Sequence, residues 1–289
     1  MKRYYLFAFG ISWVIMIFAS LYAVRFGRQV FQLVLAGVMF VPVLSVLLSG
    51  GSLKGMGWKP SFSGKKKYYA IAWFLPGIVV TAGAALFCLI FPGSLDLSGS
   101  AMAAQAGQEV LDAIQAQGMS YSMYLAVSAL QCLTIVPLIN MIPACGEESA
   151  WRGYMAPHLK EKYGREKGLV ISGIIWGVWH WPLIILAGYE YGVQYFGAPF
   201  LGPLLFCLIT IALGILTDYV YERTQCIWGP AIMHGSFNAW ATLPAAAVSP
   251  SYAMYSVLGP APVGLISALP MMLCAYMIFR KRGKLYGLR

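Results

Sequence analysis

The stretch YSMYLAVSALQCLTIVPLINMIPACGEESAWRGY, residues 121–154, joins a long apolar run to a cluster of charges. Glu147, Glu148 and Arg152 stand together at the end of that run. Ionisable groups are costly in hydrocarbon, so a cluster of this kind marks a candidate functional site. On a helix, Glu148 and Arg152 lie one turn apart on one face, in the order that favours an ion pair. Glu147 points about 100° away around the helix axis. The spacing predicts one carboxylate held by the arginine and a neighbour left available.

The composition of the whole chain is that of an integral membrane protein. Of its 289 residues, 60% are hydrophobic and only 10% are charged, whereas about 25% of the residues of a soluble domain are charged. The net charge of +10 does not indicate a nucleic-acid partner, because lysine and arginine fall between every second pair of apolar runs, which is the positive-inside pattern. The six cysteines are scattered singly, which predicts free thiols.

Eight apolar runs are long enough to cross a bilayer, for which a helix needs about 20 residues. They are residues 4–24, 29–48, 68–91, 121–148, 168–188, 200–221, 228–248 and 261–279. We therefore predict an all-α, polytopic membrane protein of about eight transmembrane helices, forming a single transmembrane domain over residues 1–289. With both termini cytoplasmic, every lysine and arginine except Arg25 and Arg28 lies inside. The acidic segment 93–120 is expected on the outer side, with a short amphipathic helix in its middle.

Further polar residues lie in apolar runs, where isolated polar groups are costly. His180 lies inside the fifth run, His234 and Asn238 are at i,i+4 in the seventh, and Asp218 is near the inner end of the sixth. Taken singly, an intramembrane histidine often only bridges two helices, and Asp218 is expected to pair with a basic group. The set of two carboxylates, two histidines and an amide instead predicts a shared polar cavity, because unpaired polar groups facing lipid are unfavourable.

These residues supply what hydrolysis requires. A carboxylate beside imidazoles is a base that activates water, and imidazole and amide donors stabilise the oxyanion that forms. No serine or cysteine lies in a recognisable nucleophile motif, so direct attack by water is favoured over an acyl-enzyme. One alternative is a transporter, because buried glutamate and histidine also form proton relays, although no matching hydropathy halves are visible. A non-proteolytic scaffold is a further alternative.

The same residues resemble the signature of the CAAX prenyl protease and bacteriocin-processing family, also called the Abi or type II CAAX endopeptidase family. That signature is EExxxR, then an aromatic residue four positions before a histidine, then His-xxx-Asn or His-xxx-Asp, each on a different helix. Glu147, Glu148 and Arg152 match the first motif, and His234 and Asn238 match the third.

The second motif is matched by Trp176 and His180, with tryptophan where the family usually has phenylalanine. The resemblance covers residues 121–240, which form the predicted catalytic core. It implies an intramembrane endopeptidase that cuts a lipid-anchored or membrane-embedded peptide near the cytoplasmic leaflet. The expected location is a prokaryotic plasma membrane, with the active site facing the cytoplasmic side.

The resemblance also implies roles for individual side chains. The implied catalytic residues are Glu147, His180, His234 and Asn238, supported by Glu148 and Arg152. Glu147, assisted by His180, would activate the attacking water. His234 and Asn238 would stabilise the oxyanion, and the supporting pair would orient the site.

Metal dependence is an open chemical alternative. Glu147, His180 and His234 would be the ligands of a zinc ion that keeps water in its fourth position, and the family has often been called a metalloprotease family. Against zinc, Asn238 is a poor ligand and the H-E-x-x-H spacing is absent. We favour a hydrolase that requires no cofactor, with a zinc-dependent version of the same protease as the alternative.

Overall fold

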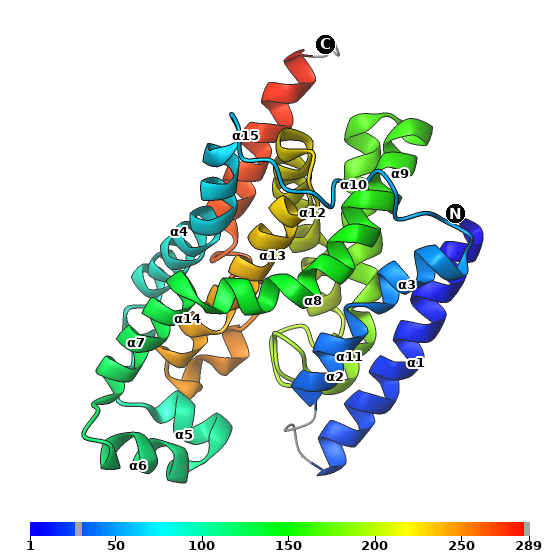
Figure 1. Cartoon of the computed structure of the whole chain (residues 1–289). Coiled ribbons are helices and arrows are strands. Elements are labelled where there is room, and N and C mark those ends of the chain that lie inside the picture. The colour runs from blue at the N-terminus through cyan, green and yellow to red at the C-terminus, as the bar shows by residue number, and fades with distance from the viewer. Residues whose placement is uncertain (27–30, 286–289) are drawn as a thin grey trace.

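A computed structural model describes the protein over residues 1–26 and 31–285, and helices joined by loops make up this part of the chain (Figure 1). The described residues form no β-strand, only an isolated bridge between Leu95 and Val248, so the predicted all-α class is confirmed. The longer helices are α1 (Lys2–Phe26), α4 (Lys66–Ile90), α7 (Tyr121–Thr134), α8 (Val136–Ala150), α10 (Arg165–Trp179), α12 (Leu201–Thr224), α13 (Trp228–Ala241) and α15 (Leu269–Leu285). The shorter helices are α2 (Phe31–Val38), α3 (Val41–Leu48), α5 (Ser100–Ala106), α6 (Gln108–Ala116), α9 (Ala156–Tyr163), α11 (Trp181–Ala187) and α14 (Leu243–Ala246).

Five helical stretches of the described chain are long and apolar enough to cross a membrane, and six if the bent α7–α8 pair counts as one span. This confirms a polytopic membrane protein. The predicted count of eight is not confirmed, because the last two predicted runs form shorter helices. Residues 228–248 are divided between α13 and α14, and α15 begins at Leu269 rather than near residue 261. The predicted turn at Arg28 and the predicted start of the second span at Gln29 lie outside the described residues.

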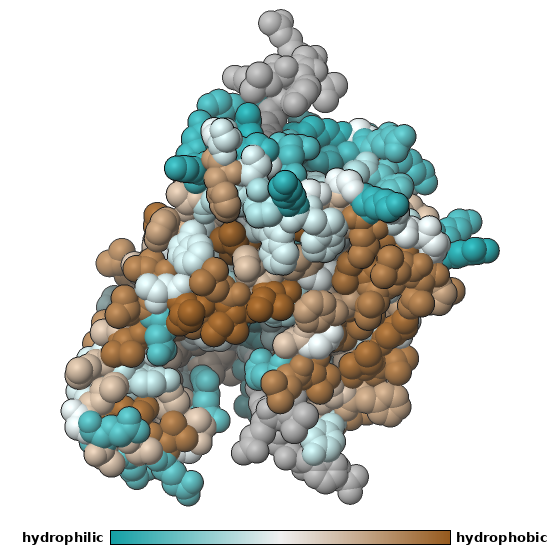
Figure 2. All heavy atoms as spheres, viewed as in Figure 1, coloured by the Kyte–Doolittle hydropathy of each residue, from teal (hydrophilic) through white to brown (hydrophobic). Residues whose placement is uncertain are grey.

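The molecule has two chemically different ends. The start of α1, the segment 49–65, α9, the end of α12 and the end of α15 carry lysine and arginine and lie toward one end, the top in Figure 1. We call this the basic end. Figure 2 shows hydrophilic residues gathered there above a broad apolar band. The opposite end, called here the far end, holds α5, α6 and the loops 188–200 and 242–268. The prediction that the basic end is cytoplasmic rests on the positive-inside pattern.

The acidic segment 93–120 forms α5 and α6 at the far end. Helix α6 buries Leu111 and Ile114 on one face, so the predicted short amphipathic helix is confirmed. All six cysteines are free thiols, also as predicted.

A bend places the charged motif at mid-depth. Helices α7 and α8–α9 meet at 51°, where Pro137 occupies the first turn of α8. Proline lacks a backbone N–H donor, which favours the first turn of a helix over its interior. Helix α8 consequently runs across the molecule instead of continuing α7 (Figure 1). A π-helical turn, Trp151–Met155, follows directly, and π-turns are frequent at functional sites. The carboxylates at the end of α8 are thereby delivered to the interior.

Glycines let the motif-bearing helices approach closely. Helix α13 packs against α8 and α4, and α10 packs against α12. A β-carbon at Gly235 would lie 2.6 Å from the backbone nitrogen of Met141, and one at Gly177 would lie 2.7 Å from Cα of Cys207. Small residues of this kind allow close backbone contact between helices in a membrane. Gly235, next to His234, thus sets the distance between α13 and α8, which carry two of the motifs, and Gly177, next to Trp176, sets the distance between α10 and α12.

Candidate active site

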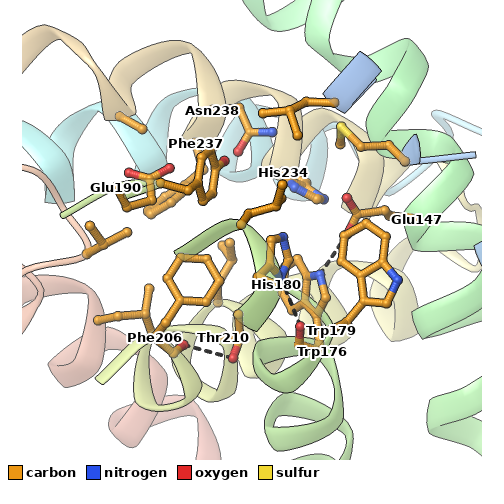
Figure 3. Close-up of a pocket in the computed structure, with 18 of the residues that line it drawn as sticks. Glu147, Trp176, Trp179, His180, Glu190, Phe206, Thr210, His234, Phe237 and Asn238 are labelled. Atoms are coloured by element: carbon orange, nitrogen blue, oxygen red, sulfur yellow. Dashed lines mark hydrogen bonds between the residues drawn. The ribbon is translucent and has the colours of Figure 1, made fainter. Parts of the chain in front are cut away.

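A cavity of about 70 Å³ lies in the interior between α2, α8, α10, α12 and α13 (Figure 3). Glu147, His180, His234 and Asn238 all line it, so the structure brings the four residues predicted as catalytic to one place. A water molecule needs only about 10–15 Å³ of such volume. The cavity therefore has room for several waters.

Glu148 is buried beneath the site and forms two polar contacts there. Its Oε1 atom lies 3.1 Å from Nη1 of Arg152 and 2.9 Å from Nδ1 of His234. The predicted i,i+4 ion pair is confirmed, and both of its side chains are almost completely buried. The second contact joins α8 to α13 and could not be read from spacing along one helix. Because the carboxylate engages Nδ1, the other ring nitrogen of His234 is the one available to the cavity.

Glu147 lines the cavity, but its carboxylate is not left without partners, which corrects the prediction made from helical spacing. The indole N–H groups of Trp151 and Trp176 both donate to Oε2 of Glu147, at 2.9 Å and 2.6 Å. Trp151 is one helical turn further along the chain, and Trp176 reaches across from α10. Among the described residues Oε1 receives no hydrogen bond. One oxygen is thereby fixed, and the other remains available to a ligand in the cavity.

Trp176 is central to the arrangement. Besides its hydrogen bond to Glu147, its ring lies 4.2 Å from the guanidinium carbon of Arg152, within the range of a cation–π contact. The ring also meets the His234 imidazole edge-on, with centroids 5.2 Å apart. The sequence pattern assigned only aromatic bulk to this position. The indole N–H is the additional chemical feature, because phenylalanine has no such donor.

His180 lies at the junction of α10 and α11, inside the single apolar span Arg165–Ala187, as predicted. Pro182 follows in the first turn of α11 and cannot continue the hydrogen-bond ladder of α10. Nδ1 of His180 lies 2.9 Å from the backbone oxygen of Trp176. A carbonyl oxygen only accepts, so Nδ1 carries the proton, and in the neutral ring Nε2 is left as an acceptor. The His180 imidazole is thus held in the form that takes up a proton.

Asn238 completes the set predicted from the sequence. It lies one turn beyond His234 on α13, half-buried at the cavity wall. Its side-chain amide forms no hydrogen bond with any described residue. A role confined to joining helices would require such a bond, so the amide is available to a ligand.

Glu190 also lines the cavity, and the sequence pattern did not single it out. It follows α11 in the tyrosine-rich loop and lies at the other side of the cavity from Glu147 (Figure 3). Its backbone has φ = 68°, a left-handed conformation uncommon for residues other than glycine. Its position in a loop with no other charge was the one signal present in the sequence.

Asp218, which was expected to pair with a basic group, and His158 do not line the cavity. Asp218 is held by Lys160 at 2.6 Å and by Arg165 at 3.6 Å, so it is a structural partner for basic groups. His158 is exposed on α9, with Nδ1 2.7 Å from the backbone oxygen of Tyr154. Neither contributes to the candidate site.

The donor atoms do not form a zinc site as they are arranged. Within the part of the chain that is described, no three histidine, cysteine, aspartate or glutamate side chains are grouped so as to hold a metal ion. Glu147 is oriented by two indoles, and His234 is oriented by Glu148. The three potential ligands line one cavity, but they are not grouped so as to hold a metal ion, and in this arrangement they do not fit zinc.

Comparison with known proteins agrees with these motifs. Residues 129–240 match a family described as type II CAAX prenyl endopeptidase, Rce1-like. The chain is also similar to CAAX prenyl protease 2 of Methanococcus maripaludis, with 31% identity over 90 residues, which are 31% of this chain and 33% of the relative. The chain therefore spans about a third of the length of the curated relative that it matches.

Proposed function

We propose that this chain is an intramembrane endopeptidase, because residues 129–240 match the type II CAAX prenyl endopeptidase family and the chain is similar to a CAAX prenyl protease. Its substrate is a lipidated or membrane-embedded peptide, held in a prokaryotic plasma membrane. The observation that carries this proposal is the convergence of a carboxylate, two imidazoles and an unpartnered amide on one small interior cavity.

Water activation falls to Glu147 and His180. A water in the cavity approaches Oε1 of Glu147, while the two indole donors keep Oε2 in place. Nε2 of His180 is a second acceptor, because Nδ1 is committed to a backbone carbonyl. As the water oxygen attacks the peptide carbonyl carbon, its proton passes to one of these two bases.

The tetrahedral intermediate is stabilised by Asn238 and His234, which line the cavity on α13. Asn238 donates from its side-chain amide to the oxyanion. His234 donates from its free ring nitrogen when the ring is an imidazolium, with the charge balanced by Glu148 at 2.9 Å. Donors of this kind are most effective in a site that excludes bulk water. The proton held by the base then moves to the departing amine, so one water is consumed and one carboxylate and one amine are produced.

The proposed activity is tested with purified protein in detergent and an internally quenched peptide that carries a farnesylated cysteine near its carboxyl end. We expect cleavage on the carboxyl side of that cysteine, and a loss of about 10²-fold or more in kcat for His180→Ala, the usual range for removal of an acid–base group. Mass spectrometry of the products identifies the bond.

Treatment with a metal chelator in the same assay tests whether activity depends on a metal ion. Activity is expected to survive prolonged chelation. Complete loss that zinc restores would instead establish the zinc-dependent alternative. Absence of cleavage by the folded wild type, with this peptide and its unprenylated counterpart, would contradict the endopeptidase.

Trp176→Phe is the sharpest test of how Glu147 is positioned. Phenylalanine retains the ring contacts with Arg152 and His234 but lacks the N–H that lies 2.6 Å from Glu147. Hydrogen bonds to charged groups contribute about 1.5–3 kcal/mol, so we expect kcat to fall by about tenfold or more, with KM changed far less. Trp181→Phe, which removes a 3.2 Å hydrogen bond to the backbone of Pro203, is the matched control. Equal kcat values for Trp176→Phe and wild type would show that the indole only fills space.

A further inference from the structure

The catalytic cavity extends away from the basic end. At about 1.5 Å of rise per residue, His180 lies about 22 Å along α10 from Arg165 at the basic end. The hydrocarbon core of a bilayer is about 30 Å thick, so this distance is more than half of that thickness. The remaining wall is formed by the first half of α12, by the loop after α11 and by Val263, all of which belong to the far-end half of the molecule (Figure 1).

A second, larger cavity adjoins the catalytic one on that side. It measures about 320 Å³ and is lined by α5, the loop residues Glu190–Gly192 and residues 245–260. We call it the vestibule. Figure 2 shows the surface hollowed beside the lobe that α5 and α6 form. Glu190 lines both the vestibule and the catalytic cavity. A chain segment passing from one to the other must therefore pass this carboxylate.

Glu190 has no basic partner. None of the described lysine, arginine or histidine side chains forms an ion pair with it. Its left-handed backbone is a conformation that costs about 1–2 kcal/mol for a residue with a β-carbon. The Tyr189 side chain forms a hydrogen bond with the Glu190 carboxylate, but a neutral hydroxyl does not balance its charge. A glutamate kept in a costly conformation, with its carboxylate at the wall of two cavities, is poorly explained by packing alone. The chemical complement of a carboxylate without a basic partner in such a place is a cation.

We propose that the peptide substrate reaches the catalytic cavity from the far end, through the vestibule, and that Glu190 binds a cationic group of the substrate as it does so. This rests on the proposed endopeptidase function and adds a specificity-determining residue to it. The cation is either a lysine or arginine side chain or a free amino terminus. If the basic end is cytoplasmic, the substrate approaches from the outer side, which differs from the cytoplasmic approach expected from the sequence.

Electrostatics agree with this placement. Glu190 follows α11 and lies outside the membrane-spanning helices, and burial raises the pKa of its carboxyl group. The cost of burying the charged form is offset when a cation arrives beside it. A neutral substrate group gains no comparable attraction.

The test compares wild type with Glu190→Gln, which keeps the side-chain size and removes the charge. The probes are farnesylated, internally quenched peptides in which one position at a time holds lysine or the uncharged norleucine, each with a free or an acetylated amino terminus. For the wild type we expect one cationic arrangement to be preferred by about tenfold in kcat/KM, mainly through KM, which corresponds to about 1.4 kcal/mol. In Glu190→Gln the ratio of kcat/KM between the cationic and the neutral peptide should fall to about one. The control is Glu109→Gln, which removes an exposed acid from α6 at the same end.

Two outcomes would overturn the inference while leaving the protease standing. The first is equal cleavage of charged and neutral peptides by the wild type, and the second is a lysine preference that persists unchanged in Glu190→Gln. Binding of the same peptides to a Glu147→Gln variant, measured by fluorescence polarisation, separates the two proposals. Charge-selective binding without any cleavage by the wild type would contradict the proposed protease activity and support the proposed cation site.

The route is tested by blocking the vestibule. Ala253 is exposed and lines it, so Ala253→Cys is treated with a bulky maleimide and assayed before and after modification. We expect modification to reduce kcat/KM by about tenfold or more, relative to the same treatment of wild type as a control for the native thiols. Modified Lys162→Cys, on α9 at the basic end, should lose less than about twofold. The reverse pattern would place the route at the basic end.

Discussion

Glu147→Gln is expected to reduce kcat for peptide cleavage by about 10²–10⁴-fold, the range for loss of a positioned general base. The glutamine oxygen still accepts from the indoles of Trp151 and Trp176, which now lie 2.9 Å and 2.6 Å from the carboxylate. Packing and hydrogen bonding are therefore retained, and the change isolates the capacity to accept a proton from water. Single-turnover cleavage of the quenched peptide measures the effect.

The control for this result is again Glu109→Gln, because it makes the same chemical change at an exposed position. Thermal unfolding in detergent should show both variants folded like the wild type. A Glu147→Gln protein that retained kcat within a few-fold of wild type would assign the base role to His180 alone, and the order of the two residues in the mechanism would change.

Arg152→Met is expected to destabilise the protein by about 3–5 kcal/mol, the usual cost of breaking a buried ion pair from one side. Methionine covers a similar apolar surface, so the loss reports mainly the charge. Glu148 would keep its contact with His234 at 2.9 Å but lose the guanidinium at 3.1 Å. The carboxylate would then be buried with too few partners, and one of its oxygens already has none among the described residues. The free energy of unfolding in mixed micelles measures this cost.

A double-mutant cycle identifies the pair as the cause. Glu148→Gln removes the stranded charge, so Arg152→Met combined with Glu148→Gln should be less destabilised than the sum of the two single variants, by about 0.5–3 kcal/mol. Asp112→Asn, which changes an exposed acid 2.9 Å from the side-chain nitrogen of Gln108, should cost less than about 0.5 kcal/mol. Additive effects in the cycle would indicate that Arg152 acts through its contact with Trp176 instead.

Much of the site could be predicted from the sequence, because the patterns that mark it involve residues close together in the chain. A carboxylate and an arginine four residues apart meet on any helix, so the pairing of Glu148 with Arg152 follows from spacing alone. His180, His234 and Asn238 stood out because polar groups are rare in apolar runs. Spacing could not supply the partners of Glu147, since Trp176 is 29 residues away along the chain. That contact depends on the tertiary structure, which brings the side chain of Trp176 on α10 to the end of α8.

The sequence by itself determined the membrane class, the helical architecture and the identities of the polar residues, because hydropathy and helical periodicity are properties of neighbouring residues. Tertiary structure decided where those residues meet. The bend after α7 places α8 across the molecule, and Glu148 there reaches His234, 86 residues further on. The loop after α11 presents Glu190 at the cavity wall, and the cavity consequently extends toward the far end. The direction in which a chain resumes after a proline break is set by the helices packed around it, and no local pattern of residues specifies it.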